Sequence, residues 1–119
     1  MNKIFKICVA LPLFAAASVA IACDYPQRAQ VPDGNSASKD EMIEGQKSVK
    51  AYMAAMEDYL ACIEAEEKDA VAEMDEAEPE ELEQRQEMMT KKYNAAVEEM
   101  EIVAAQFNEQ VRAYKGRTE

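Results

Sequence analysis

Apolar residues recur at alternating steps of three and four along two long stretches of the chain, which is the pattern of amphipathic helices. The first stretch covers residues 38–77 and the second covers residues 80–115. They are separated at Pro79, because proline does not fit inside a helix but is accepted in its first turn. Two long helices joined by a turn at residues 78–81 must fold back on each other. The pattern therefore predicts an all-α fold, an antiparallel two-helix hairpin with coiled-coil-like packing.

Counting outward from Pro79 gives the register of the two apolar stripes. Large side chains on one helix then face smaller ones on the other in several places, as interdigitated packing requires. The expected neighbours are Met74 and Leu82, Ile63 and Ala96, Met53 and Val103, and Val49 and Phe107.

Polar residues mark where the two helices begin and end. Ser38 is expected to cap the first helix, and Glu41 three residues later completes a capping box. Gly116 is expected to end the second helix, since glycine is the usual residue after a helix C-terminus. Lys115 places a cation near that negatively polarised end. Residues 116–119 are then a short tail.

Residues 1–22 have the pattern of a cleaved signal peptide. A short segment with two lysines precedes an apolar run that is too short to span a membrane as a helix. Two small residues after this run, Ala20 and Ala22, fit the pockets of a signal peptidase. We therefore expect the mature chain to begin at or near Cys23 and to act in the periplasm or outside the cell.

Residues 23–37, the arm, contain two prolines and few apolar side chains, which predicts an extended segment, and a Pro-Asp-Gly sequence ending at Gly34 predicts a turn. Export leaves Cys23 and Cys62 in an oxidising compartment, where a disulfide is the favoured interpretation. The alternative is a lipid anchor on Cys23. The residues before it match part of a lipidation motif, although Ala20 replaces the usual large aliphatic residue. Lipidation would leave Cys62 unpaired, which favours the disulfide.

Distances along the chain allow the arm to reach from one cysteine to the other. The helix from Ser38 to Cys62 is about 36 Å long, and an extended arm from Cys23 to Ser38 spans at most about 50 Å. The arm therefore has to turn and run back along the first helix, to which the disulfide would staple it. The expected docking residues are Tyr25 and Pro26 on the arm and Tyr52 and Tyr59 on the helix.

The sequence contains no histidine, which removes the commonest general base and the commonest metal ligand. Without it no nucleophile–base pair can be assembled, and a helical hairpin offers no cleft for a buried carboxylic acid. We therefore expect no enzyme activity and no cofactor.

Two groups of side chains could instead attract metal ions. Thioethers bind Cu(I). However, most of the seven methionines outside the signal segment lie on the expected seam, the line along which the apolar stripes of the two helices meet. Methionine is a common residue in such a hydrophobic core. Residues 64–83 contain 11 acidic side chains and one basic one, Lys68, without the glycines and spacing of a calcium loop. No dedicated metal site is expected, and metal binding stays an alternative function.

Without the signal segment the chain carries 11 basic and 24 acidic groups, a net charge of −13. Nucleic acid and anionic membranes would be repelled, so neither is an expected partner unless a lipid on Cys23 holds the chain at a membrane. A basic protein would be attracted to the acidic residues 64–83 around the turn between the two helices. Because one hairpin buries little apolar surface, a homodimer is a further expectation.

The arm and the first helix carry the residues Cys23-Asp24-Tyr25-Pro26, Val31-Pro32-Asp33-Gly34, Val49-Lys50-Ala51-Tyr52 and Tyr59-Leu60-x-Cys62. In these residues the chain resembles an uncharacterised family of small exported proteobacterial proteins, which share an N-terminal cysteine, a Pro-Asp-Gly turn and a second cysteine in the first helix. The resemblance covers residues 23–64. It implies export and pairing of the two cysteines, and it implies no activity.

The sequence thus predicts a non-enzymatic envelope protein that serves as a protein-interaction or structural module. A metal-binding envelope protein is the first alternative, using methionine or acidic side chains. A lipoprotein anchored through Cys23 is the second.

Overall fold

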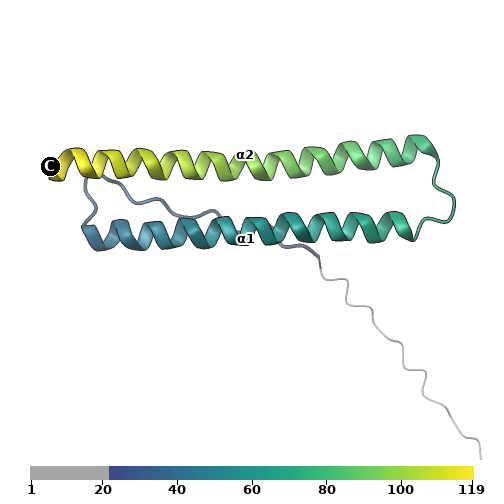
Figure 1. Cartoon of the computed structure of the whole chain (residues 1–119), viewed down its shortest axis with the longest axis horizontal. Coiled ribbons are helices and arrows are strands. Elements are labelled where there is room, and N and C mark those ends of the chain that lie inside the picture. The colour runs from purple at the N-terminus through teal and green to yellow at the C-terminus, as the bar shows by residue number, and fades with distance from the viewer. Residues whose placement is uncertain (1–21) are drawn as a thin grey trace, which may run out of the picture.

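The computed structural model describes residues 22–119 and contains two α-helices within them. Helix α1 covers Lys39–Ala72 and α2 covers Pro79–Thr118. The helices run antiparallel side by side, and the chain before α1 turns back along them (Figure 1). This arrangement confirms the predicted all-α hairpin. Neither described helix is both long enough and apolar enough to cross a membrane. The predicted signal peptide lies, apart from Ala22, outside the described residues.

Ser38 caps α1 in the predicted way. Its hydroxyl accepts a hydrogen bond from the Glu41 amide at 3.2 Å, and the Glu41 carboxylate accepts one from the Ser38 amide at 2.6 Å. This reciprocal pair satisfies two amides at a helix start, where backbone donors lack partners. It also lowers the pKa of Glu41, because the hydrogen bonds stabilise the charged carboxylate.

Helix α1 ends at Ala72 rather than at residue 77, and residues 73–78 form the connection to α2. The last turn of α1 contains no basic residue, so no cation balances the negative end of the helix dipole. Asp75 and Glu76 add like charge beside it. These charges disfavour a longer helix, and α2 then begins with Pro79 in its first turn.

Helix α2 continues to Thr118 and passes through Gly116. The expected end at Lys115 and the capping role of Gly116 are therefore wrong. Gly116 has no positive φ, and the Glu119 amide still donates to the Lys115 carbonyl oxygen at 3.0 Å. Lys115 and Arg117 lie in the last turn, where cations stabilise the negative helix end.

The earlier end of α1 changes the register by about one helical turn. Phe107 is expected beside Val49, but its ring lies against Gly45, where an added Cβ atom would be 3.6 Å away. Glu67 pairs with Arg85 across the same interface at 2.9 Å. Because the connection is centred a few residues earlier than predicted, α2 meets α1 about four positions earlier. The observed register thus differs from the predicted one by about one turn, which is the precision of counting outward from Pro79.

The core lies in one half of the hairpin. We use the name stapled half for residues 22–63 and 95–119, and tip half for residues 64–94. Residues 64–94 are all described, and none of them is buried. The buried hydrophobic residues are Ala37, Met42, Val49, Tyr52, Met56, Tyr59, Leu60, Ile63, Ala96 and Val103.

Candidate functional site

A disulfide joins the arm to α1. Cys23 and Cys62 are 39 residues apart in the sequence, and their Cα atoms are 5.8 Å apart. The arm turns at residues 33–36 and returns over the hairpin to the middle of α1, where the disulfide holds it (Figure 1). The bond uses the Cys23 sulfur, which a lipid anchor would also need. The arm is thus a third layer on the stapled half.

The four expected docking residues meet where the arm crosses α1. Tyr25 lies edge-on against Tyr59, with ring centroids 5.0 Å apart and an interplanar angle of 72°, a favoured geometry for aromatic pairs. Pro26 and Tyr52 line one shallow cavity between the arm and α1. Burial is the main reason that the pKa of the Tyr52 hydroxyl is raised. Tyr25 lies beside this hydroxyl, which has no hydrogen bond of normal geometry among the described residues.

The arm also contacts α2, a helix on which no docking was expected. Arg28 pairs with Glu99 at 3.0 Å and donates a hydrogen bond to Gln106 at 3.0 Å. Arg28 is the only basic residue between Ala22 and Ser38, and this was a signal in the sequence for a carboxylate partner. The arm therefore ties the two helices together instead of lying along α1 alone.

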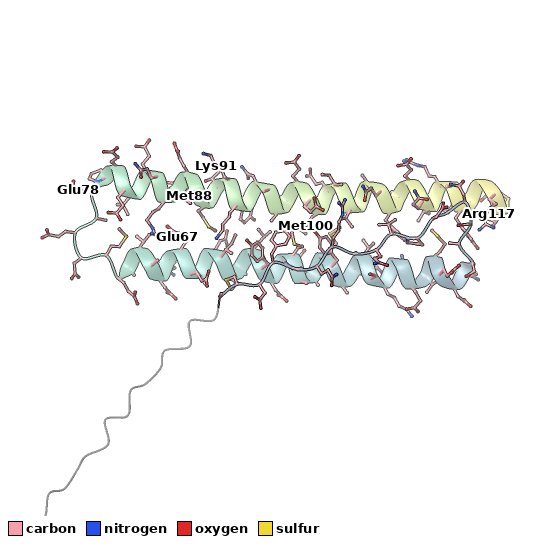
Figure 2. All side chains as sticks on the ribbon, turned by 180° about the vertical axis from the view of Figure 1, so that it is seen from behind. Glu67, Glu78, Met88, Lys91, Met100 and Arg117 are labelled. Atoms are coloured by element: carbon pink, nitrogen blue, oxygen red, sulfur yellow. A yellow bond between two sulfur atoms is a disulfide. The ribbon has the colours of Figure 1, made fainter. Side chains whose placement is uncertain are left out.

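The turn of the arm fits closely against the C-terminal end of α2. The Gly34 amide donates to the Gln110 side-chain oxygen at 2.8 Å, and Arg117 donates to the carbonyl oxygens of Gly34 and Ala37 (Figure 2). A Cβ atom on Gly34 would lie 1.9 Å from the Gln110 backbone oxygen. The turn can approach the helix this closely because glycine has no side chain.

Asp33 organises this turn through its carboxylate. It accepts hydrogen bonds from the Asn35 amide at 2.9 Å and from the Ser36 hydroxyl at 3.2 Å. The bonds from Asn35 are the main reason that the pKa of Asp33 is lowered. The charged form of Asp33 therefore helps to hold the arm in its docked position.

In the tip half, the two helices leave an open groove of about 620 Å³, which we call the tip groove. Its floor is apolar, formed by Val71 on α1 and by Leu82, Met89 and Tyr93 on α2. Val71 and Leu82 each remain 37% exposed. The polar residues along the groove are Glu64, Glu67, Lys68, Gln86, Thr90 and Asn94.

The tip groove faces away from the arm. Val71 follows Cys62 by nine residues, about two and a half turns, so the two side chains point to opposite sides of α1. The arm lies on the Cys62 side, which is the face toward the viewer in Figure 2. Glu67 and Arg85 form an ion pair between the helices at 2.9 Å, and Figure 2 shows Glu67 on the inner edge of α1. The groove therefore has a polar bridge on one side and is open on the other.

Three side chains near the disulfide have the spacing of metal ligands. The sulfurs of Cys23 and Cys62 and a carboxylate oxygen of Glu66 lie within 4.8 Å of one another. In the oxidised chain the two sulfurs are bonded together, which leaves Glu66 as the ligand of this group. Among the methionines, Met56 is fully buried and Met88 is 70% exposed. The buried thioether belongs to the core, so it is not accessible to an ion from solvent.

No protein-family model, curated protein or solved structure matches the chain. The geometry of the described residues is therefore the basis for proposing a function. It separates an arm-covered face, held by the disulfide and by contacts to α2, from the open tip groove on the opposite face.

Proposed function

We propose that the protein is an exported, non-enzymatic interaction module of the bacterial envelope, located in the periplasm or outside the cell. In this proposal the stapled half is a rigid support, and the tip half binds a protein partner. The observation that carries the proposal is the tip groove, where an apolar floor lies open between two helices whose other half is closed around a core.

Covalent and polar ties support the role of the stapled half as a rigid element. The disulfide closes a loop of 39 residues, which contributes about 4 kcal/mol through loop-closure entropy. Arg28 and Arg117 add contacts between the arm and α2, so both helices are fixed relative to each other. A support of this kind would present the tip half in a constant geometry.

Export is supported by the disulfide together with the pattern of residues 1–22. Disulfides of this kind persist in oxidising compartments and are rare in the cytosol. The absence of histidine from the sequence supports a role without catalysis. These points agree with a binding module that works outside the cytosol.

Site-specific photo-crosslinking in the native envelope tests the proposal. A photoreactive residue is placed at Leu82 in the tip groove or, as a matched control, at Ile102 in the stapled half. The two side chains are 37% and 39% exposed. We expect a defined protein adduct from position 82 and none from position 102. Adducts from neither position, or equal adducts from both, would contradict the proposal.

Two measurements separate the proposal from its alternatives. Equilibrium titration of the oxidised chain with Cu(I) or Ca²⁺ tests metal binding, and stoichiometric submicromolar binding would favour a metal-binding function. Non-reducing mass spectrometry of the envelope form tests the anchor. We expect Cys23 to be bonded to Cys62, whereas a lipid on Cys23 would make the chain a membrane-anchored lipoprotein.

A further inference from the structure

We propose that the tip groove is the docking site for a basic amphipathic helix of the partner protein. This inference rests on the proposed function and deepens it by naming the chemistry that the partner has to bring. It is carried by three properties of the groove, which are its shape, its apolar floor and the charge around it.

The shape of the groove fits a short helix. It runs along α1 from Glu64 to Val71 and along α2 from Leu82 to Asn94, which corresponds to about 11–18 Å, or two to three and a half helical turns. A third helix packs its apolar stripe between two antiparallel helices in this way. The partner helix should therefore present apolar side chains at positions i, i+3, i+4 and i+7.

The polarity of the lining also favours a helix over an extended segment. On the opposite face, Gln110 and Arg117 bind backbone amide and carbonyl groups of Gly34 and Ala37, at the turn of the arm. The tip groove has apolar side chains on its floor, so a segment bound there must satisfy its own backbone hydrogen bonds. A helix does this internally.

The floor of the groove continues the core of the stapled half. Met89 and Tyr93 are partly buried and pack against the core cluster, while Val71 and Leu82 beyond them are 37% exposed. An apolar side chain seated on this floor would extend the core into the tip half, where no described residue is buried. The groove therefore lacks one layer of side chains, which the partner supplies.

The charge around the groove selects a basic partner. Residues 64–94, which include the whole groove and the connection beside it, carry 12 acidic and four basic groups, and one of the basic groups, Arg85, is already paired with Glu67. A second copy seated on the groove would bring the same acidic segment, and like charges would oppose its binding. A helix with lysine or arginine on its polar face is attracted instead, with its cations nearest the turn between α1 and α2.

A synthetic probe tests this chemistry directly. The probe is a fluorescent peptide of about 18 residues, with leucines at the helical spacing above and lysines at the other positions. Its affinity for the oxidised chain is measured by anisotropy. We expect Leu82→Gln to weaken binding about tenfold, because the groove loses part of its floor, and Ile102→Gln to change it by less than about twofold. A peptide with glutamates in place of the lysines should not bind.

Three results would overturn the inference. The first is an equal effect of the two substitutions, and the second is equal binding of the glutamate peptide. The third is a sedimentation mass of two chains that Leu82→Gln returns to one, because this would assign the groove to a second copy. If position 82 gives a protein adduct in the envelope but the lysine peptide does not bind, the proposed function stands and the basic helix is wrong. If position 82 gives no adduct, the proposed function itself fails.

Discussion

The stapled half and the tip half are built from the same two helices, yet only the stapled half has a buried core. In the stapled half, the arm covers one face of the helix pair, and Met56 and Val103 lose almost all of their solvent exposure. In the tip half, α1 and α2 face each other alone, and the seam residues Met74 and Met89 remain half-buried. Both halves carry apolar stripes at helical spacing, so the stripes do not explain why only one half has a buried core. What distinguishes the stapled half is the arm, which packs on the two helices as a third layer.

This difference shows what a two-helix pair cannot do by itself. Each helix has an apolar stripe about a quarter or more of its circumference wide, and one neighbouring helix covers only the middle of that stripe. The arm closes the remaining gap from Cys23 to Ala37, and beyond Cys62 nothing in the described chain replaces it. The tip half therefore lacks this cover on the arm side, and on the opposite face the tip groove leaves Val71 and Leu82 partly exposed.

Removal of the disulfide should reduce the difference in stability between the two halves more than any other change. We expect Cys23→Ser together with Cys62→Ser to lower the free energy of unfolding by about 4 kcal/mol, because the loop of 39 residues is no longer closed. Urea unfolding followed by circular dichroism measures this change. Hydrogen exchange of residues 67–94 should change little, because the arm ends at the disulfide, beside Glu66. A loss below about 1 kcal/mol would mean that the staple is not what separates the two halves.

Truncation of one methionine in each half compares how much a side chain of the same type contributes to stability in the two halves. Met56 is fully buried, so Met56→Ala should cost about 2–5 kcal/mol of unfolding free energy through lost packing and the cavity left behind. Met88 is 70% exposed, so Met88→Ala should change stability by about 0.5 kcal/mol or less. Urea midpoints of the two variants give the comparison. Equal losses would contradict the view that only the stapled half has a packed core.

Two glycine substitutions test the fit of the arm on α2. An alanine at Gly34 would place its Cβ atom 1.9 Å from the Gln110 backbone oxygen, so the turn has to move away from the helix. We expect Gly34→Ala to cost about 1–3 kcal/mol. Gly116 has no atom within 4 Å of an added Cβ, and it lies within α2. Gly116→Ala should therefore stabilise the chain by about 0.5–1 kcal/mol. Thermal unfolding distinguishes the two signs, and stabilisation by Gly34→Ala would argue against close docking of the turn.

The features that depend on local pattern could be predicted from the sequence. The helical spacing of apolar residues predicts the hairpin, and the Ser38–Glu41 pair predicts the start of α1. The two cysteines and the length of the arm predict which residues the arm brings together, because the extended chain reaches Cys62 only on one path. In each case the determining residues lie within a few turns or have one available partner.

The features that depend on several competing interactions could not be predicted. Helix α1 ends at Ala72, with no basic residue in its last turn, well before Pro79 requires an end, and this shifted the register by about one turn. The contact between Arg28 and Glu99 joins residues that are remote in sequence, among many carboxylates that could have served. The tip groove was hidden for a different reason. Leu82 belongs to the predicted seam, and a seam pattern does not show that one face of the helix pair stays open there.

Acidification should loosen the stapled half and not the tip half, with the smallest effect of these tests. In the stapled half, hydrogen bonds lower the pKa of Asp33 and Glu41 below their ordinary values of 3.8 and 4.5. Because both pKa values are lower in the folded chain, the two carboxylates stabilise the folded state above the ordinary values. This stabilisation is lost as the pH falls through the folded pKa. The arm turn should therefore loosen below pH 3.8.

In the tip half, Glu78 at the start of α2 makes no side-chain capping hydrogen bond, so the helix ends beside the connection have no comparable contact to lose. Hydrogen exchange, corrected for the intrinsic rate at each pH, measures both regions in one experiment. We expect protection to fall at the amides of Asn35 and Ala37, which donate to Asp33, and to stay constant near Ala72. Asp33→Ala should remove the fall. An equal fall in both regions would mean that acid acts on the whole hairpin, and that the Asp33 carboxylate does not contribute to the contrast between its halves.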